Sequence, residues 1–240
     1  MEGMPQPPQH HKPVKFTTEK FENYEGGQDP ATLQDAAYRS AHALLSQGRA
    51  THDDAVTERL VEFTDVFGLE TIAQMWSHAA PISLPGALWR MYALRDTVQK
   101  HGAQISRYYE RGMNADWTAR VVSGVADPPT ELEIMNTADQ ILSGAYTGEF
   151  DIALERFAAF CRVVAAGEDA TAAMIEPGTY SGATGMTTQR SDESAQPSAE
   201  VRTEATARAS SLREHSTRLR GTAVELDAAA AKWRAGTLDE

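Results

Sequence analysis

Residues 84–98, LPGALWRMYALRDTV, shape the predicted architecture more than any other segment. Between Ala87 and Leu94 the only charged residue is Arg90, so a helix here would be apolar around almost its whole circumference. Pro85 suits the first turn of such a helix, because its missing N–H would have no partner there. We therefore expect residues 84–98 to form a central helix that runs through the middle of a domain.

Polar groups nevertheless interrupt this apolar stretch and the segment before it. They are Arg90, Tyr92 and Arg95, with Trp76 and His78 from the preceding predicted helix. A buried guanidinium needs a carboxylate or another anion, since leaving it unpaired costs on the order of several kcal/mol. Two interpretations stay open. Either these five residues line a pocket for an anionic small ligand, or each arginine pairs with a local acid such as Glu62, Asp65 or Glu70.

Outward from this stretch, hydrophobic residues recur at helical spacing. The most regular pattern, over residues 149–166, comprises Phe150, Ala153, Leu154, Phe157, Ala158, Cys161, Val164 and Ala165. Gly48, Gly112 and Gly167 follow periodic segments and are predicted helix ends. Nothing in residues 29–167 alternates with period two for long enough to form a strand. These residues are therefore predicted to form an all-α domain, a multi-helix bundle around the central apolar helix.

The two ends of the chain differ in composition from this body. Residues 1–28 are rich in Pro, Gln, His, Lys and Gly, and we expect a disordered tail. Residues 168–197 are dense in Gly, Ser, Thr and Pro, which is typical of a flexible linker. Residues 198–236 are rich in Ala, Arg and Glu and predict a long amphipathic C-terminal helix.

Within that C-terminal helix, large apolar residues recur every seven positions at Leu212, Leu219, Leu226 and Trp233. The row three residues further on, His215, Thr222 and Ala229, is poorly suited to a self-standing coiled coil. We therefore expect the helix to pack on its own domain or on a second protein through the four large residues.

A second polar cluster precedes Gly112 and consists of Arg107, Tyr108, Tyr109 and Arg111. Arginine beside tyrosine is common in protein interfaces and on surfaces that stack bases. The surrounding chain lacks the positive charge that nucleic-acid binding needs. The cluster is therefore predicted to serve a protein interface or the packing of a helix end.

The charge of the chain disfavours direct nucleic-acid binding. Residues 51–200 carry 10 basic and 22 acidic side chains and thus account for the whole net charge of −12. An acidic body repels phosphate backbones. The single cysteine, Cys161, lies on an apolar helix face, which predicts a buried inert thiol and a reducing, cytoplasmic environment. No apolar run is long enough to span a membrane.

The residues offer no pattern that would indicate catalysis. The histidines lack metal-ligand spacing, and glycine loops for phosphates and serine-elbow motifs are missing from the sequence. Carboxylate pairs fall in predicted first helical turns, where the helix dipole accounts for them. We therefore expect no catalytic residues, no metal and no cofactor.

Three segments together resemble an actinobacterial family of small helical proteins, over roughly residues 50–167. The segments are LETIAQMWSHAAPISLPGALWRMYALRDTV, VADPPTELEI and FAAFCRVVAAGE. The resemblance implies a helical fold and brings no catalytic residues with it.

The leading functional hypothesis is a non-enzymatic, cytoplasmic protein-interaction or regulatory module with a protein partner. Its C-terminal helix would bind that partner or dock on its own body. The first alternative is a small-molecule or anion-binding regulator, or a weak enzyme, with a pocket around Arg90. The second is an accessory factor that contacts the transcription or replication machinery through protein contacts.

Overall fold

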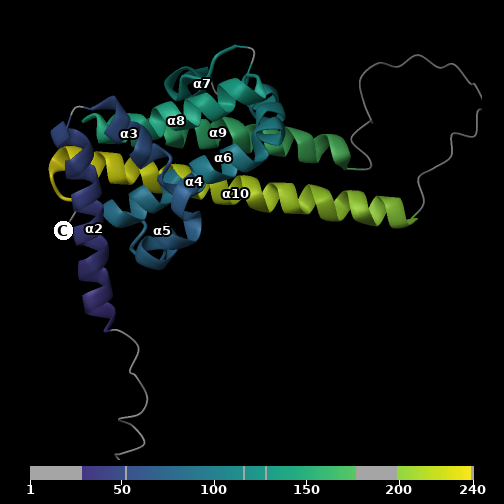
Figure 1. The fold of residues 1–240 in the computed structure, drawn as a ribbon. Coiled ribbons are helices and arrows are strands. Elements are labelled where there is room, and N and C mark those ends of the chain that lie inside the picture. Colours follow the sequence, from purple (N-terminus) through teal and green to yellow (C-terminus); the bar gives the residue numbers. More distant parts are fainter. Residues whose placement is uncertain (1–28, 52, 116, 128, 177–198, 239–240) are drawn as a thin grey trace, which may run out of the picture.

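The computed structural model describes residues 29–51, 53–115, 117–127, 129–176 and 199–238 (Figure 1). All regular secondary structure in these ranges is α-helical, which confirms the predicted all-α fold. The predicted tail 1–28 and all but the start of the predicted linker lie outside the described residues. The helices are α2 (Pro30–Thr51), α3 (Asp54–Val61), α4 (Phe63–Phe67), α5 (Leu69–Trp76), α6 (Leu84–Gly112), α7 (Trp117–Ser123), α8 (Glu131–Tyr146), α9 (Phe150–Ile175) and α10 (Ala199–Ala235).

Helix α6 contains the predicted central stretch, and most of residues 84–98 are buried or half-buried as expected. Its Ser83 cap accepts a hydrogen bond from the Gly86 N–H at 3.2 Å, which satisfies one of the free donors of the first turn. Leu84, Leu88 and Met91 have no exposed surface. At His101, φ of −129° and ψ of 25° kink the helix without ending it.

The predicted end of the helical domain at Gly167 is wrong, because helix α9 continues to Ile175. A Cβ atom on Gly167 would lie 1.7 Å from the carbonyl oxygen of Tyr108 in α6. A Cβ atom on Gly112 would lie 1.9 Å from the carbonyl oxygen of Val163 in α9. The two glycines therefore allow the backbones of α6 and α9 to meet at close range.

The helix end predicted at Gly48 is also wrong, since α2 continues past this residue to Thr51. A Cβ atom on Gly48 would lie 2.8 Å from the Cβ atom of Tyr146 in α8. Gly112, by contrast, is the last residue of α6, as predicted.

Helix α10 lies antiparallel along α9, as Figure 1 shows for the yellow and green ribbons. Ion pairs mark the register: Arg234 bonds Asp151 and Glu155, each at 2.6 Å, Arg162 pairs with Asp227, and Arg213 pairs with Glu176. The predicted C-terminal helix thus docks on its own domain in this structure.

On α10, a second row of small residues is buried beside the four large apolar residues, and it differs from the predicted row, which lies three positions after them. Ala209, Ser216, Ala223 and Ala230 are buried and recur every seven positions, three residues before the leucines and Trp233. Small side chains let two helices approach closely, so the interface is well built although His215 and Thr222 are poor interface residues. Ala223, Leu226, Ala229 and Ala230 belong to the main hydrophobic core. Helix α10 is therefore part of the body.

The described residues also bear on the predicted lack of a membrane span. No helix within them combines the length and the apolar character that crossing a bilayer requires.

Candidate functional site

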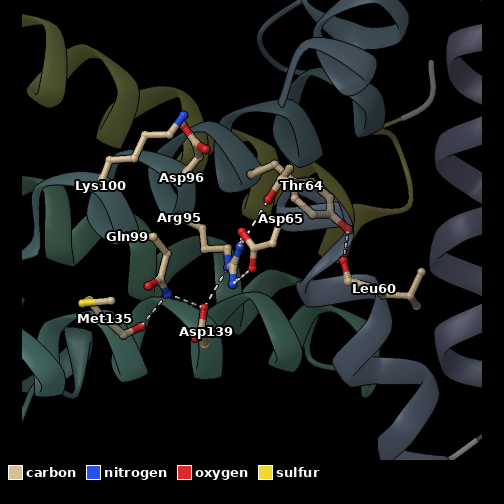
Figure 2. A network of polar contacts seen from close by, with 10 residues as sticks. Leu60, Thr64, Asp65, Arg95, Asp96, Gln99, Lys100, Met135 and Asp139 are labelled. Atoms are coloured by element: carbon tan, nitrogen blue, oxygen red, sulfur yellow. Dashed lines mark hydrogen bonds and ion pairs between the residues drawn. The ribbon is translucent and has the colours of Figure 1, made fainter. Parts of the chain in front are cut away.

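Arg95, from the first predicted site, is held by protein carboxylates. Its guanidinium donates to Asp65 Oδ1 and Oδ2 at 2.7 and 2.8 Å and to Asp139 Oδ1 at 2.7 Å (Figure 2). The side chain is 3% exposed. Burial alone would lower the pKa of Arg95, but the hydrogen bonds to Asp65 and Asp139 outweigh burial and raise it. Arg95 therefore joins α6 to α4 and α8 as a permanent cation.

Arg90 also meets a carboxylate, from an unexpected helix. Its Nε donates to Glu225 Oε2 at 2.7 Å, and Nη1 donates to the Gly86 carbonyl oxygen at 3.2 Å. The ion pair is partly buried and ties α6 to α10. The pairing of arginines with protein acids is thus the interpretation that the geometry supports, with Asp65 among the expected acids and Glu225 outside them.

The other three residues of the first predicted site do not complete a pocket. Trp76 is buried and donates from Nε1 to Ser40 Oγ at 2.9 Å. Tyr92 is buried and donates to the Leu60 carbonyl oxygen at 2.6 Å, while His78 is exposed. None of the five residues lines the groove described below or the smaller cavity between α3 and α8.

The structure instead brings together residues from the two predicted interface sets. Arg107, Tyr108 and Arg111 of α6 line a groove with Leu212 and Leu219 of α10. The groove has a volume of about 990 Å³, and α9 contributes its third side. We call it the α6–α9–α10 groove.

The remaining members of those two sets have structural positions. Tyr109 is buried, and its hydroxyl lies 2.5 Å from Ser123 Oγ. Leu226 is fully buried in the core. Trp233 packs edge-on against Phe150 with ring centroids 4.9 Å apart, and the Arg49 guanidinium lies 4.9 Å from its ring centroid.

The groove has an apolar lining from all three helices. These residues are Leu94, Val98 and Ile105 of α6, Phe160, Val164, Met174 and Ile175 of α9, and Leu212 and Leu219 of α10. Of them, Val98, Ile105, Phe160 and Val164 are buried, so they form the floor, whereas Met174 is 68% exposed at the edge. Along α6 the lining begins at Leu94, one turn beyond the Arg90–Glu225 ion pair.

The charged side chains of the groove are mainly cationic. Arg107, Arg111 and Arg208 line it and are exposed, so they form a basic rim. Glu168 is the carboxylate among its lining residues, and His101 and His215 also line it. This local excess of positive charge contrasts with the net charge of −12 of the whole chain.

Glu168 differs from the rim residues because its side chain is only 3% exposed. Its Oε1 lies 2.6 Å from Nδ1 of His215, whereas its Oε2 is buried and has no hydrogen-bond partner among the described residues. A buried carboxylate oxygen without a donor is costly. Sequence reasoning missed Glu168 because it placed residue 168 in the linker beyond Gly167, although the carboxylate directly after an apolar helix face was a signal.

Cys161 also lines the groove, as a buried thiol. It is fully buried, and burial raises the pKa of its thiol to about 12, so the thiol stays protonated near neutral pH. The described residues contain no group of His, Cys, Asp and Glu that could hold a metal ion. For binding, the groove offers an apolar floor, a basic rim and one buried acceptor.

Comparisons of this chain with protein-family models, curated proteins and solved structures found no match. The resemblance of residues 50–167 to an actinobacterial family therefore stays a prediction. The class that the fold and the groove define is an all-α bundle with a grooved surface.

Proposed function

We propose that this chain is a non-enzymatic protein-interaction module that docks an amphipathic α-helix of a partner protein in the α6–α9–α10 groove. The observation that carries this proposal is an apolar floor bordered by Arg107, Arg111 and Arg208 on an otherwise acidic protein. A helix with an apolar face and acidic flanks complements both features.

The dimensions of the groove favour a helix over a short ligand. Its α6 wall extends from Leu94 to Arg111, about 25 Å at 1.5 Å per residue. A partner helix of about five turns would cover that length. Its apolar residues would contact the floor, and its flanking glutamates or aspartates would reach the arginines.

Of the alternative hypotheses, a small-ligand pocket around Arg90 has the weaker support. Nε and Nη1 of Arg90 and all three guanidinium nitrogens of Arg95 already donate to protein oxygens. An accessory role at the transcription or replication machinery concerns which protein supplies the helix, and it stays a prediction. A cytoplasmic location also belongs to this proposal, supported by a single buried cysteine.

A labelled probe peptide tests the proposal. The probe is a synthetic helix of about 18 residues with a leucine face and glutamate flanks, carrying a fluorophore at one end. We expect saturable binding to the full chain in fluorescence anisotropy, with a dissociation constant in the range of about 1–100 μM for a standard apolar interface of modest size. Reversing the flank charges to lysine should weaken binding by at least tenfold.

Two tryptophan variants locate the binding surface. Ser211→Trp places an indole in the groove and should abolish probe binding, since Ser211 lines the groove and is exposed. Thr217→Trp, an exposed site on α10 outside the groove lining, is the matched control and should bind normally. Absent saturable binding, or equal binding by both variants, would refute the proposal.

A further inference from the structure

We propose that the groove selects a partner helix that inserts one basic side chain toward Glu168, among apolar neighbours and between acidic flanks. This inference rests on the proposed function, because it concerns the chemistry of the helix that the groove would bind. It adds a specificity residue at the floor to the general complementarity of the rim.

The first step of the argument is the state of the Glu168 carboxylate. Its side chain is almost fully buried, with 3% exposed, and it lies among the residues that line the groove. Its Oε1 is next to His215 Nδ1 at 2.6 Å, so His215 occupies one oxygen. Oε2 accepts nothing from the described residues. One acceptor of this groove-lining residue therefore lacks a donor.

The second step is the charge of that donor. A carboxylate with apolar neighbours gains most from a cation that donates a hydrogen bond, because charge-assisted hydrogen bonds are about twice as strong as neutral ones. Val164 lies one turn before Glu168 in α9, and Leu212 lies about one turn before His215, the partner of Glu168, in α10; both line the groove. Excluding water from the groove on binding would strengthen the pair further.

The third step is the difference between Glu168 and the rim. Arg107, Arg111 and Arg208 are exposed and attract acidic residues at the edges of a bound helix. A basic residue at an edge would meet these arginines and be repelled, whereas one at the middle of the apolar face would meet Glu168. The groove thus distinguishes a centrally placed lysine or arginine from one on the flanks.

Matched peptides test this selection. The parent is the leucine-faced, glutamate-flanked probe, and each derivative carries arginine at one apolar position or citrulline, its neutral isostere, at the same position. We expect that, at one position of the apolar face, the peptide with arginine binds the full chain at least tenfold more tightly than the peptide with citrulline. The preference should fall below threefold in Glu168→Gln, which keeps the shape of the side chain.

Asp169→Asn is the control variant, since Asp169 bonds Ser216 and Arg220 and does not line the groove. It should keep the arginine preference. The comparison on the unmodified chain needs no variant, so a folding defect in Glu168→Gln would not remove the test.

The outcomes separate the two proposals. If the parent probe binds but arginine and citrulline bind equally at every position, the Glu168 inference is wrong and the docking proposal stands. The Glu168 inference is also wrong if the arginine preference persists in Glu168→Gln. If no probe binds, both proposals are overturned.

Discussion

Among individual residues, buried polar groups connect the helices of this bundle by directed hydrogen bonds. The Tyr92 hydroxyl donates its hydrogen to the Leu60 carbonyl oxygen, so the 2.6 Å contact with Tyr146 must use the hydrogen of Tyr146. Both rings are buried. This relay joins α3, α6 and α8 through two hydroxyl groups that water cannot reach.

The tyrosine relay predicts a loss of stability at alkaline pH. Burial raises the pKa of Tyr92 to about 12, and it also raises the pKa of Tyr146. In the unfolded chain a tyrosine has a pKa of about 10. The stability from keeping these hydroxyls protonated is complete below pH 10, and it is lost as the pH rises toward 12.

Urea unfolding at a series of pH values measures this effect. The free energy of unfolding should fall by about 2–3 kcal/mol or more between pH 10 and 12 in the natural chain, since two units of pKa shift correspond to about that amount. A Tyr92→Phe, Tyr146→Phe double variant should start lower and fall less steeply over the same range. Parallel pH profiles for the two proteins would contradict the assignment.

Between helices, glycines set how closely the elements pack. Gly167 lies within α9 at the point where its backbone meets Tyr108 of α6, and Gly112 faces Val163 at the same crossing. Gly221 lies within α10, and a Cβ atom there would meet nothing within 4 Å. Three glycines in helices therefore have two different physical roles, which local sequence does not distinguish.

These roles predict opposite effects of the same substitution. Gly167→Ala should destabilise the protein by about 1–3 kcal/mol, because the methyl group cannot occupy the space of a carbonyl oxygen and the helices must separate. Gly221→Ala should stabilise it by up to about 1 kcal/mol through helix propensity alone. The midpoint of urea unfolding, followed by circular dichroism, reports both, and a stabilised Gly167→Ala would disprove the close crossing.

For the bundle taken together, α10 completes the core. Ala223, Leu226, Ala229 and Ala230 are buried against the other helices, and Arg90 of α6 pairs with Glu225. In Figure 1, α10 lies along α9 for most of the length of α9. The described helices therefore form a single bundle in which the C-terminal helix packs on its own domain, one of the two arrangements expected from the sequence.

Removing α10 should therefore unfold the body. A chain that ends at residue 198 exposes the faces of α6 and α9 that α10 covers, so we expect it to lose cooperative thermal unfolding and to bind the dye ANS. Adding a synthetic peptide of residues 199–240 should restore a cooperative transition. A truncated chain with an unchanged melting temperature would show that α10 is dispensable. Because deleting α10 should unfold the body, this deletion cannot by itself test partner binding.

Local features of the sequence were enough to predict the helical class, the burial of most of residues 84–98 and the need of Arg95 for an anionic partner, because periodicity, an almost uncharged stretch and the cost of burying a charge act locally along the chain. They left open whether that partner is a protein carboxylate or a ligand. The resemblance to a known family and the protein partner stay predictions. Helix ends at Gly48 and Gly167 were wrong, because a glycine that ends a helix and one that admits a neighbouring backbone look alike in sequence.

Which distant residues meet depends instead on the tertiary packing of the helices. The pairing of Arg90 with Glu225 depends on how α10 returns along α9. The same return sets the register of Ala209, Ser216, Ala223 and Ala230 and brings Leu212 and Arg107 to the lining of one groove. Arg90 and Glu225, like Arg107 and Leu212, are more than a hundred positions apart in the chain. Their proximity is set by close packing between helices, and the sequence alone does not specify which helices pack together or in which register.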